Sequence, residues 1–195
     1  MRLAAERGLA SRAHFKLEQL DRRFKLVSRR AVVLELGAAP GGWTRYLAER
    51  AGAVFALDIA EMDVPPGVAF ARIDLRDDDF DRALDDLLGG RRVDLVLSDL
   101  SPNLSGIRAA DQAQAMALVE RATVIAEGRL NPGGALVVKM FQGDGVAEWQ
   151  KAARGAFGRV VLAKPEASRK DSREVYGVAM DFSGRPDSVA GKSHV

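Results

Sequence analysis

The sequence contains no cysteine and only two histidines, His14 and His194, in 195 residues. Without cysteine the chain has no disulfides, no thiolate chemistry and no Cys-ligated zinc, and two histidines near opposite ends of the chain do not make a His-rich metal site. We therefore expect no metal. Any chemistry has to use Lys, Asp, Glu, hydroxyl groups or an organic cofactor.

Long apolar runs and linker-like segments are also missing. No apolar run approaches the roughly 18 residues of a membrane helix, and Glu6 and Arg7 interrupt the N-terminal stretch where a signal peptide would be apolar. No stretch rich in Pro, Gly and Ser divides the chain. We expect a cytoplasmic, monomeric protein without membrane contact, with one domain over residues 1–182 and a frayed tail over 183–195.

The net charge is small, but basic and acidic residues are segregated along the chain. The formal net charge is +2. Residues 1–30 carry nine basic and three acidic side chains, residues 151–195 carry nine and five, and residues 58–99 carry five and twelve. If the two basic ends meet in the fold, they form a patch suited to a polyanion such as RNA. Ordinary solvated helix faces are the alternative interpretation.

Short aliphatic and β-branched runs alternate with helical patterns through the chain. Apolar residues recur at helical spacing after Ser11, which is expected to cap a first helix. The predicted strands are residues 31–36, 54–59, 68–74, 93–99, 135–140, 159–164 and 175–182. The predicted later helices are residues 42–51, 77–88, 111–129 and 145–156. This alternation predicts a doubly wound, Rossmann-like α/β sheet of about seven strands, mostly parallel, with ligands at the carboxyl ends of the strands.

The last two predicted strands follow each other without a helix between them. A loop connection of this kind favours an antiparallel pair, because parallel neighbours need a long crossover. The sequence therefore predicts an antiparallel last strand.

A glycine-rich turn follows the first strand, in the segment ELGAAPGGW (35–43). Gly37, Gly41 and Gly42 allow close backbone approach to a ligand, and Trp43 lies at the start of the next helix, where we expect it to pack beside a cofactor. The glycine spacing departs from G-x-G-x-x-G, and Pro40 removes one amide donor from the loop, so the loop is poorly suited to bind a pyrophosphate. A nicotinamide dehydrogenase is therefore disfavoured.

Two acidic residues stand at the ends of the next two predicted strands. Asp58 lies 21 residues after Gly37, where a carboxylate can accept hydrogen bonds from ribose hydroxyls, and Asp74 is placed to take an adenine amino group. S-adenosylmethionine contains a ribose and an adenine but no phosphate. It is the cofactor that this set of residues predicts.

Several ordered segments resemble one family. ELGAAPGGW, SDLSPN followed by SG, NPGGALVVKMFQG, SREVY and the early SRAHFKL (11–17) resemble the FtsJ/RrmJ family of S-adenosylmethionine-dependent RNA ribose 2′-O-methyltransferases, over about residues 8 to 182. Leu100-Ser101 stands where the family more often has Met-Ala. Similarity to bacterial members extends between the motifs and implies large-subunit (23S) ribosomal RNA, or the large ribosomal subunit during its maturation, as partner through the basic end segments.

The resemblance also implies a catalytic tetrad of Lys16, Asp99, Lys139 and Glu174, with Asp99 near the cofactor as well. Asp99 and Lys139 are supported independently, since both are expected at carboxyl ends of parallel strands. A lysine closing the apolar run ALVV is rarely there for packing. Lys16 and Glu174 are identified by the resemblance alone.

The implied reaction is attack of a ribose 2′-hydroxyl on the sulfonium methyl group. Lys139 is the candidate that handles the hydroxyl proton, either as a neutral base or as a charged hydrogen-bond donor; the sequence leaves both open. Transfer RNA is an alternative substrate, and a catalytically silent RNA-binding assembly factor is an alternative function. The intact tetrad argues against the silent protein.

Overall fold

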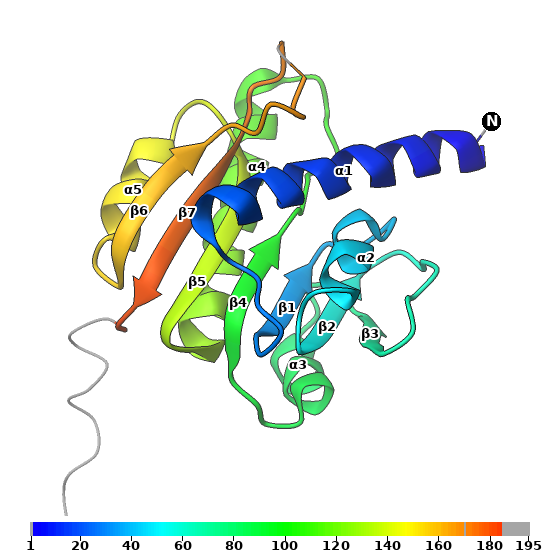
Figure 1. Cartoon of the computed structure of the whole chain (residues 1–195). Helices are drawn as coiled ribbons and strands as arrows, with labels where there is room; N and C mark the ends of the chain where they lie inside the picture. The colour runs from blue at the N-terminus through cyan, green and yellow to red at the C-terminus, as the bar shows by residue number, and fades with distance from the viewer. Residues whose placement is uncertain (1, 170, 185–195) are drawn as a thin grey trace, which may run out of the picture.

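The computed structural model describes residues 2–169 and 171–184, and within them strands and helices alternate as predicted (Figure 1). In chain order the elements are α1 (Arg2–Phe24), β1 (Val32–Leu36), α2 (Gly42–Ala48), β2 (Ala53–Asp58), β3 (Val68–Arg72), α3 (Phe80–Leu88), β4 (Val93–Ser98), α4 (Arg108–Arg129), β5 (Leu130–Phe141), α5 (Val146–Ala153), β6 (Phe157–Ala163) and β7 (Glu174–Phe182). Most of the tail that we expected to fray, from residue 185 on, lies outside the described residues.

The seven strands form one sheet in the order β3-β2-β1-β4-β5-β7-β6. The pairs from β3 to β5 are parallel, and β7 runs antiparallel to both β5 and β6. The predicted doubly wound α/β sheet with an antiparallel last strand is therefore confirmed. The carboxyl ends of the parallel strands β1, β2, β4 and β5 lie at one edge of the sheet, where ligands bind in such folds.

Helices cover both faces of the sheet and enclose two apolar layers. One layer is built with α1 and α2, through Leu17, Leu20, Trp43 and Leu47. The other is built with α3, α4 and α5, through residues such as Phe80, Val119 and Trp149. In Figure 1, α1 crosses the sheet from beyond α2 to a position over β7. The first helix thus spans both halves of the sheet.

Asp21 fixes the C-terminal end of α1. Its carboxylate accepts the Val27 amide at 2.8 Å and the Tyr46 hydroxyl at 2.7 Å, so one side chain shapes the turn after α1 and joins it to α2. The His14 ring also packs edge-on against Tyr46, with 5.2 Å between centroids. These contacts seat α1 on α2.

Several predicted boundaries were wrong. Ser11 does not cap the first helix, because α1 begins at Arg2; the preceding residues are mostly Ala, Leu, Arg and Glu, which favour a helix. The fifth strand starts at Leu130, five residues early, because Leu130 pairs with Val93 before a register shift. The third strand ends at Arg72, so Asp74 lies two residues beyond its end.

Candidate active site

The glycine-rich loop between β1 and α2 lies against the ends of both neighbouring strands. The Gly37 and Ala38 amides donate to the Leu57 carbonyl at 2.9 and 3.1 Å. Gly37 has φ 80°, and a Cβ there would lie 3.1 Å from the Leu100 amide nitrogen. Only glycine meets both requirements. Gly41, also at positive φ, precedes Gly42, the first residue of α2.

Asp58 closes β2 and turns its carboxylate toward this loop. One carboxylate oxygen accepts the Ala39 amide at 2.9 Å and the other accepts the Ala60 amide at 2.8 Å. The structure therefore brings Asp58 and the glycine-rich loop together. Each oxygen keeps a second lone pair that can accept from a ribose hydroxyl.

Asp74 is paired with Arg76, two residues further on. The guanidinium approaches the carboxylate to 2.6 Å, and these hydrogen bonds lower the pKa of Asp74 to about 2. The carboxylate is therefore ionised and able to accept from an adenine amino group, which would share it with Arg76.

The Trp43 side chain is in the core. It is 2% exposed, its indole N–H donates to the Ala13 carbonyl at 2.8 Å, and its ring lies 5.8 Å from the Tyr176 ring. Trp43 thus ties the helix after the glycine-rich loop to α1 and β7. Its role beside a cofactor stays a prediction.

Lys139 and Asp99 meet at the carboxyl ends of β5 and β4. The Lys139 ammonium donates to the Asp99 carbonyl at 2.6 Å and lies 3.4 Å from the carboxylate of the same residue. Only 11% of the Lys139 side chain is exposed. A lysine this buried requires a partner, and Asp99 supplies one.

Lys16 and Glu174 form a second pair from elements far apart in the chain. The Lys16 ammonium of α1 lies 2.7 and 3.0 Å from the two carboxylate oxygens of Glu174, the first residue of β7. Both side chains are largely buried, at 17% and 13% exposure. The contact forms only because α1 crosses the sheet.

The strand register places these groups on one face. In the antiparallel β5–β7 pair, Lys139 lies opposite Tyr176 and Phe141 opposite Glu174. Since side chains alternate between faces, Lys139, Tyr176 and Glu174 point to the same side, the side that α1 covers. The structure therefore brings the four tetrad residues together.

Tyr176 lies beneath the tetrad and was missed in the sequence. Its side chain is fully buried, and its hydroxyl donates to the Asp99 carboxylate at 3.1 Å. Burial and the nearby carboxylates of Asp99 and Glu174 raise the pKa of Tyr176 well above its ordinary value, so it stays a donor. Its position two residues after Glu174 is the period of a strand, and this was the available signal.

The loop between β6 and β7 supports Glu174, a role that the sequence did not indicate. The buried Ser168 hydroxyl donates to the Glu174 carboxylate at 3.0 Å, and the Glu174 amide donates to the Ser172 hydroxyl at 3.1 Å. The Ala167 amide donates to the Gln19 side-chain oxygen at 3.1 Å, which attaches the loop to α1. No periodicity marks loop residues, so the sequence gives no signal for them.

Two carboxyl groups in this region have raised pKa values. Burial raises the pKa of Asp99, against the lowering effect of Lys139 and Lys16. Burial also raises the pKa of Glu35 to about 8, and Asp99 and Asp58 add to this against the hydrogen bond from Thr44, 2.8 Å long. Glu35 of β1 is therefore influenced both by Asp58 of the cofactor site and by Asp99 of the tetrad.

This arrangement can hold and polarise a hydroxyl group. Two buried ammonium groups, each paired with a carboxylate, offer donors to an oxygen that develops negative charge, and the carboxylates fix their positions. Among residues 2–169 and 171–184, no cluster of His, Asp and Glu is suited to a metal ion. No described helix is long and apolar enough to cross a membrane.

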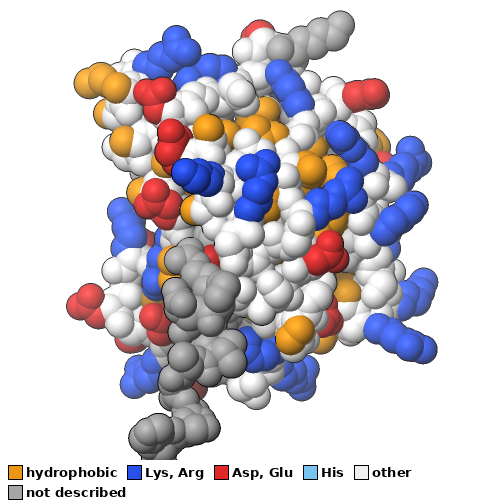
Figure 2. All heavy atoms as spheres, turned by 90° about the vertical axis from the view of Figure 1, so that its left-hand side faces the viewer, with side chains coloured by type: hydrophobic (Ala, Val, Ile, Leu, Met, Phe, Trp, Pro, Cys, Tyr) orange, Lys and Arg blue, Asp and Glu red, His pale blue; other side chains and the backbone are white. Residues whose placement is uncertain are grey.

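The basic segments at the two ends of the chain approach each other. The Gln19–Ala167 hydrogen bond joins α1 to the loop after β6, and the Arg159 guanidinium of β6 lies 5.9 Å from the centroid of the Phe24 ring. Figure 2, which looks onto the β6 edge of the sheet, shows Lys and Arg side chains spread across this face with fewer acidic ones between them.

Comparison with known proteins agrees with this geometry. Residues 9–182 match the family of FtsJ-like methyltransferases. A protein of Chromohalobacter salexigens named Ribosomal RNA large subunit methyltransferase E is 47% identical over 180 residues, which cover 91% of this chain and 86% of the relative. A protein of the same name from Legionella pneumophila (strain Corby) is 44% identical over 183 residues, 92% of this chain and 89% of the relative.

Solved structures share the fold. A Plasmodium falciparum structure described as a ribosomal RNA methyltransferase superposes with a TM-score of 0.80 at 27% identity, over 90% of this chain and 99% of that one. A Streptococcus mutans structure described as a methyltransferase in complex with SAH has a TM-score of 0.55 at 13% identity, over 88% of this chain and 95% of that one. At that identity the second likeness concerns the fold alone.

Proposed function

The chain belongs to the FtsJ-like methyltransferase family, and we propose that it transfers a methyl group from S-adenosylmethionine to a ribose 2′-hydroxyl of large-subunit ribosomal RNA. The observation that carries the proposal is the meeting of Lys16, Asp99, Lys139 and Glu174 from α1, β4, β5 and β7. The relatives named as large-subunit ribosomal RNA methyltransferases support the choice of RNA.

The residues at the first three strands fit S-adenosylmethionine. Asp58 and Asp74 are carboxylates with capacity for ribose and adenine donors. The Gly37 and Ala38 amides already donate to the Leu57 carbonyl and the Ala39 amide to Asp58, so these three amides are not available to phosphates. When bound, S-adenosylmethionine supplies an electrophilic methyl group on its sulfonium. The protein has to present the RNA hydroxyl in line with it.

Lys139 is the group that meets the 2′-hydroxyl. Asp99 holds its ammonium through both the carbonyl and the carboxylate, and Tyr176 holds the Asp99 carboxylate. In the displacement, the oxygen–methyl bond forms as the methyl–sulfur bond breaks, and the hydroxyl loses its proton. Lys139 stabilises the charge on that oxygen or takes its proton, and Lys16 adds a second positive charge.

RNA reaches this site over the basic segments of α1 and the β6–β7 region. We propose that the protein acts as a monomer in the cytoplasm, where its ribosomal substrate is assembled. Because phosphate contacts release counterions, RNA affinity should fall steeply with added salt.

The test uses S-adenosylmethionine with a labelled methyl group. Large ribosomal subunits from cells lacking this protein, their naked RNA and transfer RNA serve as three parallel substrates. We expect label in large-subunit RNA from the wild type and none with Lys139→Ala. A 2′-O-methyl group blocks alkaline cleavage of the next phosphodiester, which locates the modified ribose. Label on a base, or in transfer RNA alone, would overturn the proposal.

A further inference from the structure

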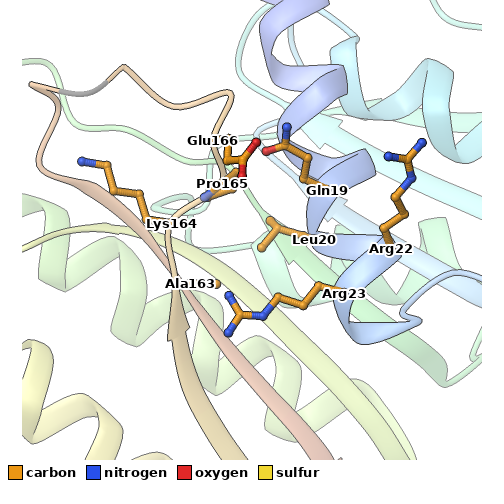
Figure 3. A pocket seen from close by; sticks show the side chains of 8 residues that line it. All are labelled: Gln19, Leu20, Arg22, Arg23, Ala163, Lys164, Pro165 and Glu166. Atoms are coloured by element: carbon orange, nitrogen blue, oxygen red, sulfur yellow. The ribbon is translucent and has the colours of Figure 1, made fainter.

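A pocket of about 410 Å³ opens between the last turns of α1 and the chain that leaves β6 (Figure 3). It is lined by Gln19, Leu20, Arg22 and Arg23 from α1 and by Ala163, Lys164, Pro165 and Glu166 from the end of β6 and the following loop. None of these residues belongs to the tetrad or to the cofactor loop.

The pocket has an apolar floor and a charged rim. Leu20, Ala163 and Pro165 are buried and form the floor. Figure 3 shows the Arg23 side chain reaching over this floor toward Ala163, with Glu166 on the opposite side. A flat apolar group that also has polar edges fits such a lining.

The pocket shares a wall with the tetrad. Gln19, Leu20 and Arg23 follow Lys16 at intervals of three, four and seven residues, so they lie on the same face of α1 and begin about one turn, or 5.4 Å, beyond it. On the loop side, Ala167 binds Gln19 and the adjacent Ser168 binds Glu174. The pocket therefore adjoins the tetrad along α1 and along the loop after β6.

The sheet order places the pocket on the side of the tetrad away from the cofactor. The cofactor residues belong to β1, β2 and the chain after β3, the tetrad to β4, β5, β7 and α1, and the pocket to the end of β6. The three sites therefore lie in sequence across the sheet. A substrate that receives its methyl group from one side extends toward the other.

Charge selects an anionic occupant. The lining contains Arg22 and Arg23 against one carboxylate, that of Glu166, and Lys164 of the rim donates to the Ser172 carbonyl at 2.7 Å. The Arg22 side chain is 78% exposed and 3.5 Å from Glu18, so its guanidinium still faces solvent. An aliphatic floor next to arginines suits a nucleobase joined to its phosphate.

We propose that this pocket holds the nucleotide next to the methylated ribose, with its base between the floor and the Arg23 side chain and its phosphate toward Arg22. The inference rests on the proposed function, because it assigns a place to part of the same RNA. Glu166 and the Gln19 amide face the edge of the base and make the pocket selective among bases.

The test is a double-mutant cycle between protein and RNA. Synthetic RNA fragments around the mapped ribose carry an abasic site on its 5′ side or on its 3′ side. For the wild type, one of the two lowers kcat/KM about tenfold, in the range of a lost base contact. In the double variant Arg23→Ala/Glu166→Ala, replacing the intact RNA by the same abasic RNA should lower kcat/KM less than twofold.

A matched pair tests for general charge effects. Arg82→Ala with Glu120→Ala removes one exposed charge of each sign from α3 and α4, on the other face of the sheet, and should keep the full tenfold effect of the abasic site. The abasic site and the double variant each lower kcat/KM by some factor. If these factors simply multiply when both changes are combined, at the 5′ and at the 3′ position alike, the pocket assignment is wrong. If the wild type does not methylate the intact fragment or the whole subunit, the proposed function itself fails.

Discussion

The cofactor half and the reaction half of the sheet are held together in different ways. Around Asp58 and Asp74 the hydrogen bonds join residues between 2 and 19 positions apart. Around the tetrad they join residues 158, 77 and 40 positions apart, in the pairs Lys16–Glu174, Tyr176–Asp99 and Lys139–Asp99. The cofactor half is a local unit, and the reaction centre exists only when α1, β5 and β7 are all in place.

This difference predicts that the two halves fail separately. Loss of a reaction-half side chain should lower kcat with methyl-donor affinity unchanged, because it acts on the transition state. Loss of a cofactor-half side chain should lower methyl-donor affinity first. Variants in each half test whether the two effects are separate.

Lys139→Ala should have the largest effect. Lys139 contacts the reacting hydroxyl in our mechanism, so its removal should lower kcat by at least about 10²-fold, the lower range for general acid–base catalysis. Calorimetry should find unchanged S-adenosylmethionine affinity. Single-turnover methyl transfer at the wild-type rate would exclude Lys139 from the reaction.

The same position separates the two roles of Lys139. In Lys139→Arg the guanidinium stays protonated and donates hydrogen bonds but does not accept a proton. Substantial activity would favour electrostatic stabilisation. Activity as low as that of Lys139→Ala, with the fold intact by circular dichroism, would favour a base.

Asp58→Ala is the corresponding change in the cofactor half. It removes the ribose acceptor and the support of the Ala39 amide, and should weaken S-adenosylmethionine by about 1.5–3 kcal/mol, roughly 10- to 150-fold in Kd. Asp63→Ala is the control, because Asp63 is an exposed acid whose carboxylate pairs with Arg45 at 3.3 Å. Unchanged calorimetric affinity would remove Asp58 from the cofactor site.

Glu35 lies between the halves and gives a pH-dependent prediction. The folded protein holds a proton on Glu35 up to about pH 8, whereas the unfolded chain releases it near its ordinary pKa of 4.5. The folded state therefore binds more protons in this window, and stability falls as pH rises, by up to about 1.4 kcal/mol per pH unit. The loss is complete above pH 8.

Glu35→Gln stays neutral and should remove this pH dependence. The difference in free energy of unfolding between the variant and the wild type should grow in favour of the variant from pH 5 to pH 8, in urea titrations. Glu61→Gln, at an exposed acid, should follow the wild type at every pH. Parallel wild-type and Glu35→Gln curves would mean that Glu35 is not held neutral.

The same contrast explains what could be predicted from the sequence. The sheet, the glycine-rich loop and Asp58 could be predicted from local patterns, because hydrophobic periodicity and strand ends depend on residues that are close in sequence. Lys139 and Asp99 also stood out, as polar residues at the ends of apolar runs. Asp74 was predicted to end the third strand, but β3 ends two residues earlier, at Arg72.

Lys16 and Glu174 could not be found from spacing. Their contact spans 158 residues and depends on where α1 crosses the sheet, so only the family resemblance identified them. Tyr176 had a weak signal in the strand period, and Ser168 had none. The start of α1 was missed because Ser11 has the chemistry of a cap but lies within a segment of strong helix formers.

Ser168→Ala should give the smallest effect and tests the long-range half most finely. The Ser168 hydroxyl donates to Glu174, which holds Lys16. Without it Glu174 keeps its ion pair but loses one positioning contact, worth about 1 kcal/mol, the typical net contribution of a hydrogen bond. We expect kcat to fall about fivefold, with KM for RNA and affinity for S-adenosylmethionine unchanged.

Ser168→Thr retains the hydroxyl and should recover most of the activity, which a purely structural loss would not do. Ser183→Ala is the control, because Ser183 donates its hydroxyl to the Ala156 carbonyl at 3.3 Å, away from the tetrad. If Ser168→Ala instead weakened the methyl donor as much as it lowered kcat, the two halves would be coupled through the β6–β7 loop. The described residues of that loop form hydrogen bonds with α1 and with Glu174, and none with the glycine-rich loop. We therefore expect kcat alone to change.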